Sequence, residues 1–441
     1  MKILAISNVF PPGFIGGYEL GAFEILNDLS HKGHSVRVLT TNYFGDPLAN
    51  GEIDVNRCLD CSVFSHLPRE RDFIRECYYN HLNIGIISSE IKKYNPDVVL
   101  CFNLYGLGPV GILKFLEFIK VPYVVYLMDN FFEGINANPY LSNLFNKYFG
   151  SLAFLKHSFV ISMSTRLSEE VGSTINSKLE NVTYVPGWVD ISTFKKSKIN
   201  LSEENFRKFV FSSRIAEHKG VSILLEAVKK LRDLGYKNFI VDVFGNGDVS
   251  NLINRILNEN LIDHIHYMGC LPKDAMKDML TNYDALVFPT WEREPFGFIV
   301  TEAATAGALP ILTAGTGASE WFIHERDSLK IQRTPESLAT AMRFVMEMDT
   351  QDLIKFRRRT FKESRRTFSS SNWFSVIEST LERCTEKREF SLNNVFLMQV
   401  EASFMNLARI SKLYKPFLLQ FMSIEHRGRF LMNYSISRNF E

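Results

Sequence analysis

The chain is poor in cysteine and has no long apolar run, and each shortage argues against a class of protein. Six cysteines are scattered through 441 residues, too few to staple a small secreted scaffold, and we expect them to be reduced. No run of about 18 apolar residues is present, so the sequence predicts no ordinary transmembrane helix. The apolar start Ile3–Ser7 is followed by Pro11 and Pro12, which leaves it too short for a signal peptide. We therefore expect a cytoplasmic protein.

An excess of charge of either sign is also missing. Lys and Arg together number 50, Asp and Glu number 49, and the formal net charge is +1. Strongly basic nucleic-acid-binding proteins have a different balance, so whole-molecule charge gives no indication of such a partner.

Short apolar runs alternate with helical patterns in both halves of the chain. Runs that are apolar throughout are typical of strands buried on both faces of a parallel sheet. The alternation predicts a doubly wound α/β architecture, with two Rossmann-like domains facing each other across a cleft. The predicted strands are Ile3–Ser7, Ser35–Thr40, Val98–Phe102, Tyr123–Leu127, Phe159–Ser162, Val182–Val185, Phe209–Ser212, Phe239–Phe244, Ile265–Met268, Ala285–Pro289 and Leu309–Thr313.

The polar segment Ser192–Lys208 separates the two halves and is the predicted linker. After about residue 370 the alternation ends, and Trp373–Cys384 is typical of one more amphipathic helix. The remaining tail has apolar residues at helical spacing beside eight Lys or Arg. The predicted division is 1–191 for the first domain, 192–371 for the second, and 372–441 for a C-terminal helix with a helical tail.

The first glycine-rich segment, Pro11–Glu19, lies directly after the first predicted strand and before a helix. Gly16 and Gly17 let a ligand approach the backbone closely, and the N–H groups of a helix N-terminus suit an anion. The segment matches neither the dinucleotide pattern G-x-G-x-x-G nor the P-loop pattern. Taken alone, the signal is weak, because such a Gly-Gly segment is usually only a turn.

Two further segments combine charge with turn residues. Arg214 and Lys219 stand five positions apart after a predicted strand, a spacing that suits the grip of a diphosphate, although solvated surface cations are the simpler alternative. In Pro289–Ala303, Glu294 precedes a helix predicted to begin near Phe298, and Glu302 lies about one turn into it. The two carboxylates suit sugar and ribose hydroxyls; the alternative is acidic residues that favour the helix dipole.

Together these segments resemble the motifs of family 4 of the retaining glycosyltransferases, which have the GT-B fold. Arg214 and Lys219 match the basic pair of that family. Glu294 and Glu302 match its E-x7-E motif. Other matches, in order over about residues 1–385, are Gly16-Gly17 with Glu19, Gly33–Val36, Gly245–Asp248, Gly269–Pro272 and Ala314–Glu320.

The resemblance implies transfer of a sugar from a nucleoside-diphosphate sugar to an acceptor hydroxyl, with retention of configuration. The first domain would then bind the acceptor and the second the donor. The implied catalytic residues are Arg214, Lys219, Glu294 and Asp129. The implied donor-binding residues are Gly16, Gly17, Glu302, Phe296, Gly297, Phe298, Gly245 and Leu271.

The resemblance also implies the partners. The basic pair would replace the divalent metal ion of other transferases, and no Asp-x-Asp pair is present, so no metal site and no cofactor besides the donor is expected. The donor is UDP- or GDP-linked, the acceptor is a glycan, a lipid-linked molecule or a small molecule, and no nucleic acid is involved.

Two features keep alternatives open. Met128-Asp129 stands where the family often has His-Asp, so the second hypothesis is an inactive sugar-nucleotide-binding protein, and an epimerase of the same fold comes third. Lys355–Arg366 holds seven cations, which usually indicates a solvated helix face. With the apolar and basic tail, the alternative is peripheral contact with an anionic bilayer, at the inner face of the membrane.

Overall fold

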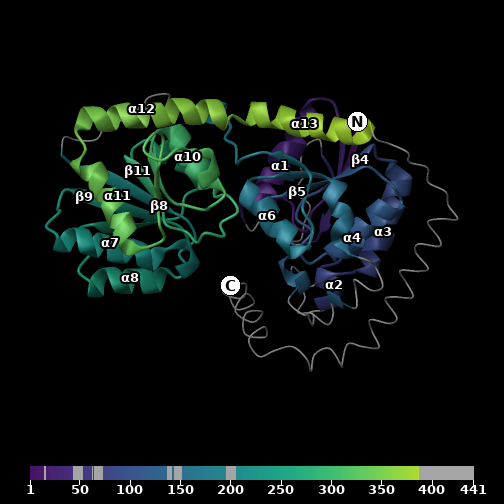
Figure 1. Ribbon diagram of the computed structural model, residues 1–441, viewed down its shortest axis with the longest axis horizontal. Helices are drawn as coiled ribbons and strands as arrows, with labels where there is room; N and C mark the ends of the chain where they lie inside the picture. Colours follow the sequence, from purple (N-terminus) through teal and green to yellow (C-terminus); the bar gives the residue numbers. More distant parts are fainter. Residues whose placement is uncertain are drawn as a thin grey trace, which may run out of the picture. The chain divides into compact units, whose positions relative to one another are not determined.

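The computed structural model describes residues 1–13, 16–42, 53–61, 63, 73–136, 142–143, 151–194 and 205–386 (Figure 1). The chain divides into two compact units. Unit 1 consists of Met1–Ile161, Ser168–Thr183 and the chain from Glu378 on, and unit 2 consists of Ser162–Leu167 and Tyr184–Ile377. Each unit is built around one sheet, and we describe each by itself.

The sheet of unit 1 has seven strands in the order β3-β2-β1-β4-β5-β6-β7, and the pairs β1–β2, β1–β4, β2–β3 and β4–β5 are parallel. Strands β4 and β5 are buried along their whole length, as expected for strands covered on both faces. The elements are β1 Lys2–Ile6, α1 Gly17–His31, β2 Ser35–Thr41, β3 Asp54–Leu59, α2 Phe73–Cys77, α3 His81–Tyr94, β4 Val98–Cys101, α4 Pro109–Phe118, β5 Tyr123–Leu127, η1 Glu133–Asn136, η2 Leu152–His157, β6 Phe159–Ser162, α6 Thr165–Thr174, β7 Asn181–Tyr184 and η3 Ile191–Thr193.

The sheet of unit 2 has six strands in the order β10-β9-β8-β11-β12-β13, and every neighbouring pair is parallel. Phe209 of β8 pairs with Val241 on one side and Ala285 on the other. The elements are β8 Arg207–Ser212, η4 Glu217–Lys219, α7 Val221–Asp233, β9 Phe239–Phe244, α8 Val249–Asn258, β10 Ile265–Gly269, α9 Lys273–Leu280, β11 Ala285–Phe288, α10 Phe298–Ala306, β12 Leu309–Thr313, η5 Ala318–Trp321, β13 Leu329–Ile331, α11 Pro335–Glu347, α12 Thr350–Thr367 and α13 Ser370–Glu386.

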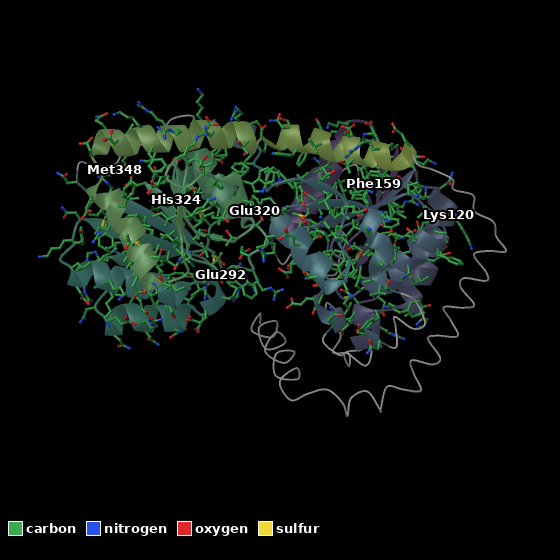
Figure 2. The ribbon with its side chains drawn as sticks, in the orientation of Figure 1. Lys120, Phe159, Glu292, Glu320, His324 and Met348 are labelled. Atoms are coloured by element: carbon green, nitrogen blue, oxygen red, sulfur yellow. The ribbon has the colours of Figure 1, made fainter. Side chains whose placement is uncertain are left out.

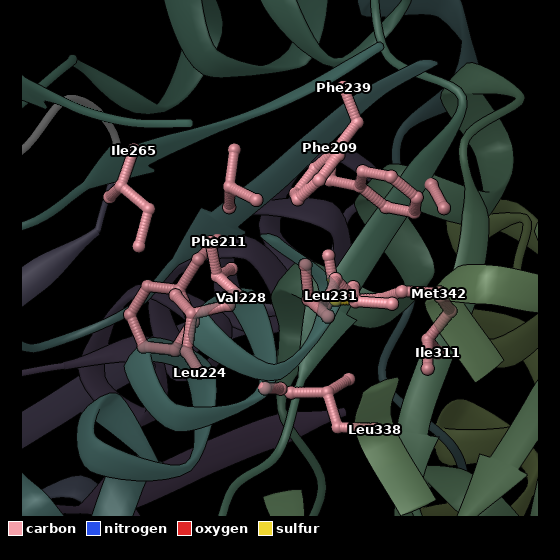
Figure 3. Packing of buried hydrophobic residues seen from close by; sticks show 14 of the residues in the cluster. Phe209, Phe211, Leu224, Val228, Leu231, Phe239, Ile265, Ile311, Leu338 and Met342 are labelled. Carbon is pink, nitrogen blue, oxygen red and sulfur yellow. The ribbon is translucent and has the colours of Figure 1, made fainter. Parts of the chain in front are cut away.

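The core of unit 2 lies between its sheet and the helices α7 and α11. Leu224, Val228 and Leu231 recur at helical spacing on α7 and face the sheet, where Phe209 and Phe211 meet them (Figure 3). Leu338 and Met342 of α11 complete the layer. In Figure 1, α10 and α12 lie on the opposite side of this sheet from α7 and α8. Helices therefore cover both faces of the sheet. The loops that connect strands and helices lie at the ends of the strands.

The predicted fold class is confirmed: two doubly wound parallel α/β sheets are followed by C-terminal helices. The predicted linker Ser192–Lys208 is wrong at its end, because Arg207 and Lys208 already belong to β8. Strands β3 and β13 were not predicted. Among the helices of the described residues, none combines the length and apolar character that a membrane span requires. The predicted helical tail, residues 387–441, lies outside the described residues.

Candidate functional site

The strand order of unit 2 places two loops at its centre. Strand β8 has β9 on one side and β11 on the other, so the chain turns in opposite directions after β8 and after β11. In a doubly wound sheet such a switch point, at the carboxyl ends of the strands, is where ligands bind. The loop after β8 carries Arg214 and Lys219, and the loop after β11 carries Glu294. The topology therefore brings these sequence-predicted residues to one edge of unit 2.

The two loops meet through an ion pair. Lys219 Nζ donates to Glu294 Oε2, and Thr290 Oγ1 donates to the same oxygen at 3.0 Å. The Lys219 side chain is 19% exposed and that of Glu294 is 11% exposed, so the charges attract each other in surroundings less polar than water. Gly220, with φ of 85°, lets the loops pack closely, since a Cβ there would lie 2.0 Å from the carbonyl oxygen of Pro289. Lys219 and Glu294, distant in sequence, form one site.

His218 adds an imidazole ring to this edge. Its ring lies 5.2 Å from the ring of Trp291, which is 37% exposed. Partial burial, together with the positive charges of Lys219 and Arg214, lowers the pKa of His218. The sequence analysis did not single out either aromatic residue. In the sequence, they could have been found only because His218 stands next to Lys219 and Trp291 stands in the same segment as Glu294.

The predicted helix after the Glu294 loop begins at Phe298, as expected. Gly297 has a φ of 93°, and a Cβ there would lie 2.7 Å from the Phe288 ring, so the turn requires glycine. Phe296 is buried, and Glu302 is only 8% exposed in the second turn of α10. The free N–H groups at the start of this helix favour an anion.

Gly245 and Leu271 follow β9 and β10 at the same edge of the sheet. A Cβ on Gly245 would lie 1.9 Å from the carbonyl oxygen of Ser213, so this glycine lets the loop after β9 rest on the loop after β8. Leu271 is 36% exposed. The structure therefore brings the unit 2 candidates to loops of neighbouring strands, and we find no contact that assigns a ligand to Gly245 or Leu271.

In unit 1, Gly16 and Gly17 follow β1 at the switch point of the sheet, where β1 has β2 and β4 as neighbours, and Asp129 follows β5, the strand beside β4. Gly16 N–H donates to Glu19 Oε2 at 2.9 Å, which caps α1. Tyr18, between them and not predicted, donates its phenol to the Tyr126 carbonyl oxygen at 2.5 Å. Burial raises the pKa of Tyr18, a backbone hydrogen bond from Met128 opposes the shift, and the charge of Asp129 adds to it. Tyr18 thus joins Gly16, Gly17 and Asp129 into one cluster.

A further G-x-G-x-x-G pattern spans Gly106–Gly111, from the loop after β4 into the first turn of α4. A Cβ on Gly108 would lie 2.6 Å from the backbone nitrogen of Asn80, and a Cβ on Gly111 would lie 2.6 Å from the Tyr79 ring. These glycines are used for packing of the loop and of α4 against the protein itself. The pattern gives no support for dinucleotide binding.

In the ranges that the structure describes, no group of three or more His, Cys, Asp or Glu is arranged to hold a metal ion. Cys58, half of the sequence's C-x-x-C pair, is a free thiol whose pKa burial raises to about 11.

The comparisons with known proteins agree with this geometry. Residues 192–367 match the family model described as "Glycosyl transferases group 1". An uncharacterized glycosyltransferase of Methanocaldococcus jannaschii is 25% identical over 365 residues, which cover 77% of this chain and 87% of that protein. The match to the family model covers the loops of Lys219 and Glu294.

Solved structures share the fold over most of the chain. Sucrose-phosphate synthase from Thermosynechococcus elongatus superposes with a TM-score of 0.70 at 16% identity, over 88% of this chain and all of that chain. HepE of Anabaena, in complex with UDP and glucose, superposes with a TM-score of 0.60 at 17% identity, over 87% of this chain and 99% of that chain.

Proposed function

We propose that this chain, whose residues 192–367 match the group 1 glycosyltransferases and whose two parallel sheets have the GT-B arrangement, moves a hexose from a UDP- or GDP-linked nucleotide-sugar donor to an acceptor hydroxyl. The Lys219–Glu294 ion pair carries this proposal. It joins a cation suited to phosphate and a carboxylate suited to sugar hydroxyls at the switch point of one sheet. The solved HepE complex holds UDP and glucose, which supports the same class of donor here.

In the proposed reaction the bond between the sugar's anomeric carbon and the diphosphate oxygen breaks while a bond to the acceptor oxygen forms on the same face. The acceptor proton passes to the departing phosphate. Negative charge grows on the diphosphate in the transition state, and Arg214, Lys219 and the N–H groups of Phe298 and Ile299 would stabilise it. Fixed donors of this kind contribute roughly 3–4 kcal/mol each to transition-state stabilisation. Glu294 would hold the transferred sugar and Glu302 the ribose, with Phe296 and Gly297 shaping the turn between them.

The fixed cations are expected to do the work of a divalent metal ion, so activity should persist in EDTA. Lys219→Ala and Arg214→Ala should each lower kcat by roughly 10²-fold. Lys229→Ala removes an exposed cation of α7 that no proposed step uses and serves as the matched control. The donor itself is identified by a screen in which turnover of UDP-sugars and of GDP-sugars is measured by mass spectrometry. Turnover that strictly requires Mg²⁺ or Mn²⁺ would contradict the proposed mechanism.

A second candidate function is a sugar-nucleotide-binding protein without catalysis. Met128, where the resembled family often has His, is only 5% exposed at the end of β5, and a thioether supplies neither acid nor base. Isothermal titration with the donor, combined with a donor-hydrolysis assay, separates the two functions. Tight donor binding without turnover on any acceptor would favour the inactive protein.

The unit 1 residues Gly16, Gly17 and Asp129 stay predictions for this reaction, and so does contact with a membrane surface. On α12 the structure leaves five cations exposed, while Arg357 and Arg365 are used internally. The exposed set is Lys355, Arg358, Arg359, Lys362 and Arg366. Such a stripe suits an anionic bilayer that carries a lipid-linked acceptor. Co-sedimentation with anionic liposomes at low salt tests it, with the Arg358, Arg359 and Lys362 triple serine variant as comparison.

A further inference from the structure

A short segment at the start of α6 forms hydrogen bonds to the residues before and after Glu294. Ser164 Oγ donates to the carbonyl oxygen of Pro295 at 3.3 Å. The Arg166 guanidinium donates to the carbonyl oxygen of Arg293 at 2.8 Å. Ser164 and Arg166 belong to Ser162–Leu167, which is part of unit 2 although it lies 130 residues earlier in the chain than this loop. The residues on either side of Glu294 are therefore fixed by the same segment.

That segment is itself held by Glu320, at the surface of unit 2 (Figure 2). The carboxylate of Glu320 accepts hydrogen bonds from Thr165 N at 2.7 Å, Thr165 Oγ1 at 2.5 Å and Arg166 N at 2.8 Å. Backbone N–H groups at the first turn of a helix lack partners within the helix, and an anion there is favourable. The neighbouring Trp321 donates its indole N–H to the Met163 carbonyl oxygen at 3.1 Å. Glu320 and Trp321 thus tie the start of α6 to η5.

The remaining side of the loop has no room to shift. Gly317 N–H donates to the carbonyl oxygen of Glu294 at 3.0 Å. A Cβ on Gly317 would lie 1.7 Å from the carbonyl oxygen of Pro295 and 2.9 Å from Ser164 Oγ. The backbone carbonyl oxygens of Arg293, Glu294 and Pro295 therefore all accept hydrogen bonds. Glu320 and the residues next to it in the sequence hold the donors of these bonds in place.

We propose that Glu320 is a positioning residue for Glu294, acting through Thr165 and Arg166 on the loop that carries the carboxylate. The inference rests on the proposed function, in which Glu294 contacts the transferred sugar. Loss of the Glu320 carboxylate frees the start of α6, relaxes the grip on Arg293 and Pro295, and moves Glu294 relative to the sugar. Misplacement of a reacting group by about 1 Å costs up to 10²-fold in rate. Nucleotide binding through Glu302 and the cations is not disturbed by this change.

The test compares Glu320→Ala with the wild-type chain in steady-state kinetics. We expect kcat to fall about 10-fold while the donor KM changes less than 2-fold, because uniform binding is kept. Glu320→Gln should recover part of the loss, since its amide oxygen, placed where Oε2 lies, still accepts the two hydrogen bonds from Thr165. Glu226→Ala, on the exposed face of α7, is the matched control and should leave both constants unchanged.

A double-mutant cycle with Glu294→Ala separates positioning from a general structural role. Once the Glu294 carboxylate is gone, its placement no longer matters, so Glu320→Ala should lower kcat less than 2-fold further. Equal losses in both backgrounds, or no loss in the wild-type background, would overturn the inference and leave the proposed function intact. Full activity of Glu294→Ala would overturn the site assignment and the inference together. If Glu320→Ala does not fold, Arg166→Met, which keeps the backbone bond to Glu320, takes its place in the cycle with the same expected outcomes.

Discussion

Glu294 and Glu302 stand eight positions apart, yet their carboxylates meet different surroundings. Both are buried, but Glu294 lies in a loop and accepts hydrogen bonds from Lys219 and Thr290, whereas Glu302 lies on α10. On the proposed function, Glu294 contacts the reacting sugar, so Glu294→Ala should lower kcat by roughly 10²-fold. Glu302 is proposed to bind the ribose equally in the ground and transition states, so Glu302→Ala should mainly raise the donor KM. Steady-state kinetics at varied donor concentration decide this, and two variants with wild-type constants would contradict both assignments.

Gly187 packs directly against the ring of Phe296, which lies in the loop that carries Glu294. A Cβ there would lie 2.3 Å from the Phe296 ring, and the adjacent Trp188 packs edge-on against Phe298 and Phe374. Gly187→Ala should therefore lower the free energy of unfolding by about 1–3 kcal/mol through overpacking. Gly85→Ala is the matched control: it lies within α3 with open space around its Cα and should raise stability by roughly 0.5–1 kcal/mol. Thermal denaturation of both variants checks the opposite signs.

At the scale of elements, helix α12 is anchored to its sheet by a buried ion pair. Arg357 Nη1 donates to Asp284 Oδ1 at 2.8 Å, and both side chains are at most 1% exposed. The same guanidinium donates to the carbonyl oxygens of Gly307 and Tyr283. Arg357→Ala leaves the Asp284 carboxylate buried without its counter-charge, so we expect a loss of about 3–5 kcal/mol in the free energy of unfolding.

The neighbouring Arg358 supplies the control for that prediction. It lies on the exposed face of α12, so Arg358→Ala should change stability by no more than about 0.5 kcal/mol. Chemical denaturation measures both variants under one condition. Similar, small losses in the two variants would show that the buried pair contributes little to the attachment of α12.

The elements that sequence alone predicted are those whose burial leaves a simple pattern. β4, β5, β11 and β12 are largely apolar and buried throughout, and each was predicted to within one residue. β3 and β13 were missed, and both are edge strands. β3 is only partly buried along most of its length, and β13 has three residues. The edge strands β7 and β10 were predicted, so edge position alone is not the reason. A strand that is only partly buried, or only three residues long, carries a weaker periodic signal.

At the scale of the molecule, the candidate site is assembled from loops that only the topology brings together. Turn chemistry and charge marked Arg214, Lys219 and Glu294 as candidates within their own segments. The bond between Lys219 and Glu294 spans 75 positions, and it depends on β8 and β11 being neighbours at the switch point. Contacts that distant leave no local pattern. The same reason hid the bonds of Glu320 to Thr165 and Arg166, which span more than 150 positions.

A contact between residues even further apart in the sequence leads to a prediction of how stability depends on pH. Glu378 of α13 bonds Lys32 Nζ and His34 Nε2 at 2.8 Å each, over more than 340 positions and within unit 1. These hydrogen bonds lower the pKa of Glu378 below its ordinary value of 4.5. A carboxyl whose pKa is lower in the folded state stabilises that state above the unfolded-state value, and the stabilisation is lost as pH falls through the folded-state value.

The stability difference between wild type and Glu378→Gln should therefore be greatest near neutral pH and shrink as pH falls below about 4.5. Glu382→Gln, an exposed carboxyl one turn further along α13, is the control and should follow the wild type at every pH. Thermal midpoints of the three chains from pH 7 to pH 3.5 provide the measurement. A difference for Glu378→Gln that stays constant over this range would mean that the carboxylate charge is not what holds α13 to α1, and that packing alone makes this attachment.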